Sequence, residues 1–303
     1  MRNLSIASMA LFLLLLAACG GGSSSSSTAA STLSGNWQLN LVQEEPRPQS
    51  SLSISGFLAQ DNEALTGSVA TPSVAQKNNC GGVSPVLGTI TGQNVTFSIM
   101  ESGTTLNFTG TISSDNTSMS GDYQAPGGGC FTTATSGTWN AFLVPTLTGN
   151  FTGTIDSQYV EALEGATAAV PVKVSGSMTQ SSNVGTATAT VTGTINAVNY
   201  PCFSTASVSG TISGTSVYLQ VFGYNGEQIG TIGQPSSTPG LAGNPAIVDT
   251  TSSGISLVGG STALDLGVGN SVGTSGPCPP IVVNTQPYPL NTDEAAINFN
   301  FAQ

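Results

Sequence analysis

The sequence predicts an all-β protein of two tandem antiparallel domains, each an up-and-down barrel or a sandwich, behind a signal peptide and a Gly/Ser tether. Three observations predict this fold. Apolar and polar residues alternate with a period of two along many short runs, turn residues separate the runs at hairpin spacing, and no run has the period of an amphipathic helix. Short strands with regular turns are typical of sandwiches and barrels.

Residues 1–18 have the pattern of a bacterial signal peptide. Arg2 precedes an apolar run from Met9 to Leu16, which is shorter than the ~20 residues that a membrane-spanning helix needs. The run ends in Leu16-Ala17-Ala18-Cys19, which resembles the lipobox of bacterial lipoproteins. The resemblance implies cleavage before Cys19 and acylation of its thiol, for which palmitate is a typical chain. A plain cleaved signal peptide with an incidental cysteine is the alternative.

Residues 19–31 are expected to be the lipidated cysteine and a flexible tether, because Gly20-Gly21-Gly22 is followed by a run of serines. Two or more acyl chains hold a protein stably on a membrane. Glycine at position 20, in place of aspartate, resembles the sequence that is sorted to the outer membrane in a cell with two membranes. We therefore expect a lipid-anchored protein of the cell envelope, in the outer membrane of such a cell.

The first β-domain is expected over residues 32–144. Its first run, residues 33–41, puts Trp37 and Leu39 on one face and Gln38 and Asn40 on the other, as in a half-buried strand. Similar runs lie at residues 65–69, 86–90, 95–99, 106–112, 119–123 and 137–143. The turn pairs between runs are Asp61-Asn62, Gly92-Gln93, Ser102-Gly103 and Asp115-Asn116, so consecutive strands are expected to pair as neighbours.

The second β-domain is expected over residues 146–303, because residues 147–151 (Leu-Thr-Gly-Asn-Phe) repeat the pattern of residues 33–37 (Leu-Ser-Gly-Asn-Trp). Its strands are expected near residues 170–178, 187–195, 206–212, 217–221, 229–232, 255–258 and 295–301, with loops at 234–244 and 267–280. About eight strands per copy would allow each sheet to close, which removes exposed edges.

Glycine recurs at inward positions of both copies, at 35, 67, 88, 110, 121, 137, 149, 176, 193 and 210. Glycine weakens a strand unless the chain bends tightly or a neighbour packs close to it. Small, strongly coiled barrels need such positions.

Composition excludes one class of partner. Only 6% of the 303 residues are charged and the formal net charge is −11, so there is no basic face for nucleic acid. Solubility must then depend on Ser, Thr, Asn, Gln and Gly, which suits strands whose outer faces are polar.

Four cysteines remain beside Cys19, and in an oxidising compartment they are expected to form disulfides. Three pairings are possible. The division into two domains favours Cys80 with Cys130 and Cys202 with Cys278. A metal site is the alternative, but Cys-x-x-Cys spacing is missing and the chain has no histidine.

Gly35-x-Trp37 and Gly137-x-Trp139 resemble the Gly-x-Trp strand of lipocalins and the first strand of avidin-like barrels. The resemblance implies an eight-stranded barrel that holds one small ligand in its mouth, with Trp37 and Trp139 as candidate ligand-binding residues. The alternative is a sealed barrel in which both tryptophans fill the core.

Catalysis is not expected. Without histidine, a serine nucleophile would need Lys77 or Lys173 as its base, and neither lies in a Ser-x-x-Lys motif. The acidic pairs Glu44-Glu45, Asp61 with Glu63, and Asp293-Glu294 are placed as exposed strand ends or turns.

We therefore expect no cofactor and no metal. The expected function is that of a structural or adhesive module that contacts a glycan or a surface protein. A calycin-like barrel that binds a small apolar ligand or a glycan is the alternative.

Overall fold

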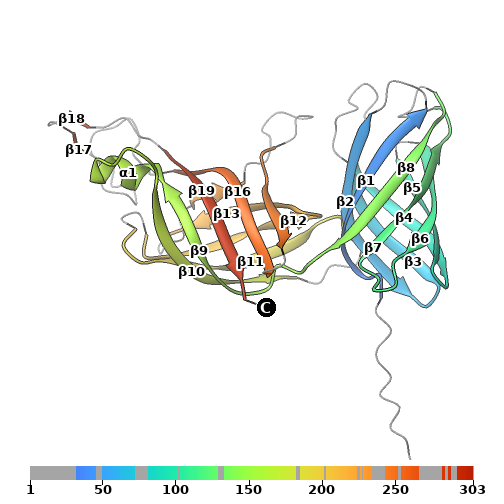
Figure 1. Cartoon of the computed structure of the whole chain (residues 1–303), viewed down its shortest axis with the longest axis horizontal. Helices are drawn as coiled ribbons and strands as arrows, with labels where there is room; N and C mark the ends of the chain where they lie inside the picture. The colour runs from blue at the N-terminus through green and yellow to red at the C-terminus, as the bar shows by residue number, and fades with distance from the viewer. Residues whose placement is uncertain are drawn as a thin grey trace, which may run out of the picture. The chain divides into compact units, whose positions relative to one another are not determined.

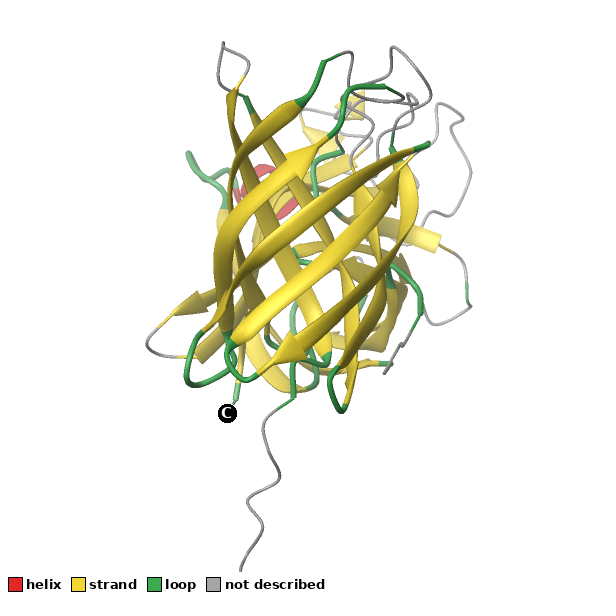
Figure 2. Ribbon diagram, turned by 90° about the vertical axis from the view of Figure 1, so that its right-hand side faces the viewer, coloured by secondary structure: helices red, strands yellow, loops and turns green. Residues whose placement is uncertain are grey.

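Antiparallel strands make up nearly all of the regular structure in the computed structural model (Figures 1 and 2). It describes residues 32–45, 50–71, 81–101, 103–128, 133–181, 185–200, 203–223, 226, 228–233, 243–251, 254–265, 282–283, 286–287 and 292–302. The signal peptide, the tether, all five cysteines, Lys77 and nearly all of the two expected loops lie outside these residues. No helix of the described part is long and apolar enough to cross a membrane.

The first sheet is a closed barrel of eight strands: β1 (Gly35–Glu45), β2 (Ser51–Asp61), β3 (Ala64–Thr71), β4 (Gly82–Thr91), β5 (Asn94–Glu101), β6 (Thr104–Ile112), β7 (Ser118–Ala125) and β8 (Thr135–Val144). Each strand pairs with the next, and β8 pairs with β1, which confirms the up-and-down barrel. The prediction missed β2, although Leu52, Ile54, Gly56 and Leu58 alternate along it as in the other strands.

The second sheet also closes on itself. Its strands are β9 (Gly149–Ser157), β10 (Val170–Gln180), β11 (Ala189–Ala197), β12 (Thr205–Ser213), β13 (Ser216–Phe222), β14 (Gln228–Ile232), β15 (Ala246–Thr251), β16 (Gly254–Asp265) and β19 (Thr292–Phe301). The pairing runs from β9 in order to β14, then to β16, to β19 and back to β9. Strand β15, which the sequence did not predict, pairs with β13 and β16. The two-residue strands β17 (Val282–Val283) and β18 (Gln286–Pro287) form a separate hairpin.

Each barrel begins with the same set of hydrogen bonds. In each barrel, a glutamine near the end of the second strand accepts a hydrogen bond on its side-chain oxygen from a backbone N–H that precedes the first strand. The backbone N–H of the same glutamine donates to the side-chain hydroxyl of the following Ser or Thr. The four bonds are Leu33 N to Gln60 Oε1 (2.9 Å), Gln60 N to Ser34 Oγ (3.0 Å), Leu147 N to Gln180 Oε1 (2.9 Å) and Gln180 N to Thr148 Oγ1 (3.0 Å). This shared geometry supports an internal repeat.

The cross-strand rows of the two barrels also correspond. Starting from the aromatic residue of the first strand, direct partners on successive strands form one row in each barrel. The rows are Trp37, Gly56, Val69 and Ser84 in the first barrel, and Phe151, Gly176, Ile195 and Ala206 in the second. In both rows a glycine lies opposite the aromatic residue. At Gly176, a Cβ would come within 2.7 Å of the Phe151 ring.

Aromatic side chains fill much of the first barrel. The Phe97 and Phe108 rings stack with centroids 4.5 Å apart, and the Trp139 indole meets both rings edge-on. The indole lies against Gly110, where a Cβ would come within 2.8 Å of it. Glycine at this position makes room for the Trp139 indole.

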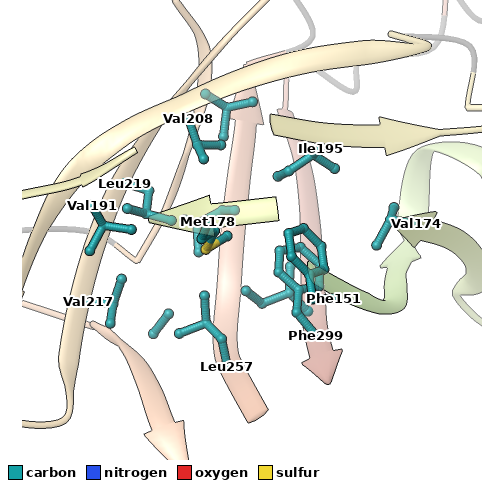
Figure 3. Packing of buried hydrophobic residues seen from close by; sticks show 14 of the residues in the cluster. Phe151, Val174, Met178, Val191, Ile195, Val208, Val217, Leu219, Leu257 and Phe299 are labelled. Atoms are coloured by element: carbon teal, nitrogen blue, oxygen red, sulfur yellow. The ribbon is translucent and has the colours of Figure 1, made fainter. Parts of the chain in front are cut away.

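The core of the second barrel is formed mainly by aliphatic side chains around a smaller aromatic group. Phe151 and Phe299 stack with centroids 4.8 Å apart, and Figure 3 shows these two rings beside one another, with Met178 and Leu257 nearby in the same cluster. The described core residues of this barrel, including these four, are buried.

One short helix lies among the strands of the described residues. Helix α1 (Gln158–Glu164) follows β9, and Figure 2 draws it in red. Ser157 caps it by accepting a hydrogen bond from Val160 N (3.0 Å), and Gly165 ends it in the left-handed conformation (φ 65°). Seven residues are two turns, too few for the helical period to show in the sequence.

Buried polar groups on the outer face of β1 hold the turn between β12 and β13. Asn36 Nδ2 donates to Gly214 O (2.8 Å), and Gly214 N donates to Asn36 Oδ1 (2.7 Å). Gln38 Oε1 accepts from Thr215 N (3.3 Å). Both barrels belong to one compact part of the chain, Thr32–Gln303, and this contact joins them. The contact explains why two outward amides of β1 are buried.

We expect Gly121→Ala to lower the free energy of unfolding by about 3 kcal/mol, because its Cβ would clash with the backbone of Thr109 and Gly110 on the paired strand. Urea denaturation measures the change. Gly92→Asn is the control: Gly92 has φ 61° with open space around it, and asparagine tolerates this conformation, so the loss should stay within about 1 kcal/mol. Equal losses in the two variants would contradict close strand packing at Gly121.

Candidate functional site

The two ends of the first barrel differ. At one end the strands are joined by the two-residue turns Asn62-Glu63 and Gly92-Gln93, and the chain enters there at Leu33. At the other end, β3, β5 and β7 finish while β4, β6 and β8 begin, and two of the connections are long. We call this second end the mouth. Long connections at one end of a barrel are where binding residues concentrate.

The inward side chains change from apolar to polar at the mouth. Along β5 the inward series is Val95, Phe97, Ile99 and then Glu101, all buried. Neighbouring strands show the same change. The polar residues of this last layer, which we call the mouth layer, are Thr71, Ser84, Glu101, Thr104 and Thr135.

Glu101 is the charged member of the mouth layer and is only 5% exposed. Its Oε1 accepts hydrogen bonds from Thr71 Oγ1 (2.9 Å) and from the backbone N of Gly81 (2.9 Å). These bonds link the end of β5 to the end of β3 and the start of β4. Both donors are neutral, whereas a buried carboxylate is costly unless its charge is also balanced.

No basic side chain of the described residues balances that charge. The described part of the chain holds one basic residue, Lys173, which is exposed on β10 of the second barrel opposite Thr154. Glu101 was not singled out from the sequence. The signal that could have found it is the period-two series of β5, in which a carboxylate takes the fourth inward position.

A bulge in β1 brings further negative charge to the mouth. The pairing of β1 with β8 shifts register between Gln43 and Glu45, which leaves Glu44 as the extra residue. Burial raises the pKa of the Tyr123 phenol above its ordinary value, and the negative charge of Glu44 raises that pKa further. Glu44 therefore lies close enough to the barrel interior to act on an inward side chain.

At the corresponding end of the second barrel, two matching positions are apolar. Ser84 of the mouth layer corresponds to Ala206, and Thr71 corresponds to Ala197. Tyr200 and Phe203 meet edge-on there with ring centroids 5.0 Å apart. The polar mouth layer is thus not a requirement of this barrel architecture.

Trp37 and Trp139 lie in the core of the first barrel, at 0% and 2% exposure. Trp37 Nε1 donates to Leu33 O (2.8 Å), and Trp139 Nε1 donates to the carbonyls of Thr109 (3.1 Å) and Asp122 (3.2 Å). Both indole donors are therefore satisfied by backbone. A solvent-sized void beside these rings would expose them, so a ligand could reach them only by displacing other side chains.

The other candidates from the sequence are not brought together. Asp61 precedes an exposed turn that contains Glu63, at the end opposite the mouth, and Glu45 ends β1 in solvent. Asp293 and Glu294 lie in β19, but their side chains are outside the described part. Among the described residues no group of three or more acidic, cysteine or histidine side chains could hold a metal ion.

Comparison with protein-family models, with curated proteins and with solved structures finds no match for this chain. The resemblance of the Gly-x-Trp motifs to lipocalins and avidin-like barrels therefore stays a prediction.

Both tryptophans are expected to emit at short wavelength and to be quenched weakly by acrylamide, because both rings are buried. Steady-state fluorescence of the folded chain, with the urea-unfolded chain as the reference, measures both properties. Quenching of the folded chain as strong as that of the unfolded chain would mean that solvent or a ligand reaches the interior.

Raised pKa values of Tyr123 and Tyr218, due first to burial, predict a loss of stability in base. Both phenols bind their protons more tightly when folded, so their contribution is complete below about pH 10 and is lost as the pH rises through the folded-state values. Urea denaturation between pH 8 and pH 12 measures the loss. Tyr123→Phe should make it smaller, and Glu44→Gln should shift the titration of Tyr123 downward. An unchanged profile in Tyr123→Phe would contradict the assignment.

Proposed function

We propose that the chain is a lipid-anchored protein of the cell envelope or cell surface, whose two barrels serve as a non-catalytic structural or adhesive module. The lipobox resemblance at residues 16–19 supports the anchor, with acyl chains on Cys19. Glycine at position 20 supports the outer membrane as the location in a cell with two membranes.

The packed interior of the barrels is the observation that carries the proposal. The core side chains of both barrels are buried, and in the first barrel they include Trp37, Phe108 and Trp139. An eight-stranded barrel has an interior that its own side chains can fill. A partner can therefore contact such a domain at its outer faces and at its ends.

The outer face of the first barrel is suited to many weak polar contacts. Asn40 Nδ2 donates to Asn140 Oδ1 (3.3 Å) across β1 and β8, and Thr89 pairs with Thr96 (3.0 Å) across β4 and β5. Asn140, Thr89 and Thr96 are exposed, Asn40 is half-buried, and all four keep further hydrogen-bonding capacity. A glycan or a polar protein surface is the class of partner that such a face fits.

Two disulfides, Cys80 with Cys130 and Cys202 with Cys278, belong to the proposal. The connections that carry Cys80 and Cys130 both leave the mouth of the first barrel, after Thr71 and Ala125. Those with Cys202 and Cys278 both leave the corresponding end of the second barrel, after Ala197 and Asp265. An envelope location supplies the oxidising conditions that disulfides need.

A small-ligand barrel is the second candidate, and the polar mouth layer is the observation that favours it. The buried interior weighs against an apolar ligand deep in the barrel. A polar ligand at the mouth, within reach of Glu101 and the hydroxyls beside it, fits the side chains better.

Replacing Cys19 tests the anchor. The full chain is expected to enter the detergent phase on Triton X-114 partitioning and to incorporate labelled palmitate, whereas Cys19→Ser should lose both properties because the acylated thiol is gone. Cys80→Ser is the matched control and should keep both. Detergent partitioning of Cys19→Ser like that of the unchanged chain would overturn the anchor.

The released Cys19→Ser chain also tests the adhesive role. It is expected to bind envelope fragments from cells that lack the protein, in a saturable manner that salt weakens little, because the outer faces are polar but carry few charges. Retention on none of the fragments, with the fold intact by circular dichroism, would count against adhesion and leave only the structural role.

A further inference from the structure

Described residues donate hydrogen bonds to one oxygen of the buried Glu101 carboxylate and not to the other. Both hydrogen bonds, from Thr71 Oγ1 and Gly81 N, fall on Oε1. No described residue donates to Oε2, although the side chain is 5% exposed. A carboxylate so buried gains most from a positively charged donor at its open oxygen.

The layer that holds the Glu101 carboxylate is polar. Nearby, the mouth layer supplies hydroxyls that can accept hydrogen bonds. The second barrel has alanine at two corresponding positions, 197 and 206, so the fold does not demand these polar groups.

We propose that the mouth layer of the first barrel binds a primary ammonium group, with Glu101 Oε2 as its counter-ion and neighbouring hydroxyls as further acceptors. An ammonium is compact and presents three donors, which suits one carboxylate oxygen within a set of hydroxyls. A guanidinium prefers both oxygens of a carboxylate, and Oε1 already accepts two hydrogen bonds.

The ammonium can belong to a small free amine or to a lysine side chain of another protein. In either case the site lies at a barrel end and does not depend on the lipid anchor. A lysine-bearing partner would give the adhesive role a specific contact. Loss of amine binding and loss of anchoring are therefore separate outcomes.

Isothermal titration calorimetry of the full chain in mild detergent at pH 7.5 tests the site. The probes are n-butylamine and the peptide acetyl-Gly-Lys-Gly-amide, with n-butanol as the neutral control and n-butylguanidine as the planar cation. We expect saturable binding of at least one amine probe, none of butanol, and binding of the guanidine weaker by about tenfold.

Glu101→Gln keeps the shape of the side chain and removes its charge, so it should weaken amine binding by about tenfold or more. Glu63→Gln, in an exposed turn at the other end of the barrel, is the matched control and should bind like the unchanged chain. Should Glu101→Gln fail to fold by circular dichroism, Ser84→Ala replaces it. That variant installs the alanine of the second barrel and should fold, with amine binding weakened several-fold.

The comparison of probes identifies the source of the ammonium. Binding of butylamine alone supports a small amine, and tighter binding of the lysine peptide supports a protein partner. The proposal is overturned if neither amine binds the unchanged chain, if butanol binds equally, or if a folded Glu101→Gln chain binds amine unchanged. Amine binding that appears only in Lys77→Gln would also overturn it, because the counter-ion would then come from the chain itself.

Discussion

The pairing of β8 with β1 closes the first barrel, and closure dictates how near the strands must come to one another. Gly110 and Gly121 face each other across β6 and β7, where any Cβ would clash with the neighbouring backbone. The space that Gly110 leaves is taken by the Trp139 indole, whose N–H then reaches two backbone carbonyls. Closure of the barrel therefore requires glycine where the strands come close, and the aromatic ring fills the space beside it. The second barrel has the same arrangement, with Gly176 against the Phe151 ring.

Much of this fold could be predicted from the sequence, because half-buried strands show their period directly. The repeat at residues 147–151 was visible for the same reason. The helix α1 was not, since its two turns are defined by a serine cap and a glycine rather than by a period. Strand register and the closure of the second sheet through β16 and β19 depend on contacts far apart in the chain. Glu101 could have been found from the sequence, because it is the polar residue in an otherwise apolar inward series of β5. Its hydrogen bond from Gly81 N could not, because that bond depends on where the chain between β3 and β4 returns to the barrel.

The two barrels are one scaffold with different ends. The rows that begin at Trp37 and Phe151 match residue by residue across three strands and then diverge, to Ser84 in one barrel and Ala206 in the other. The divergence falls at the barrel ends, while the packed centre keeps its glycines and apolar residues. The side chains that can contact a partner therefore lie at the barrel ends and on the outer faces.

The first barrel receives the chain and releases it at the same end. Leu33 precedes β1 there, Val144 finishes β8 there, and Val144 is the direct partner of Asn36 near the start of β1. A pull applied to the chain ahead of Leu33 is consequently passed to the residues after Val144 through one pair of neighbouring strand ends. The opposite end, with Glu101 and its hydroxyl neighbours, lies off this path of mechanical load.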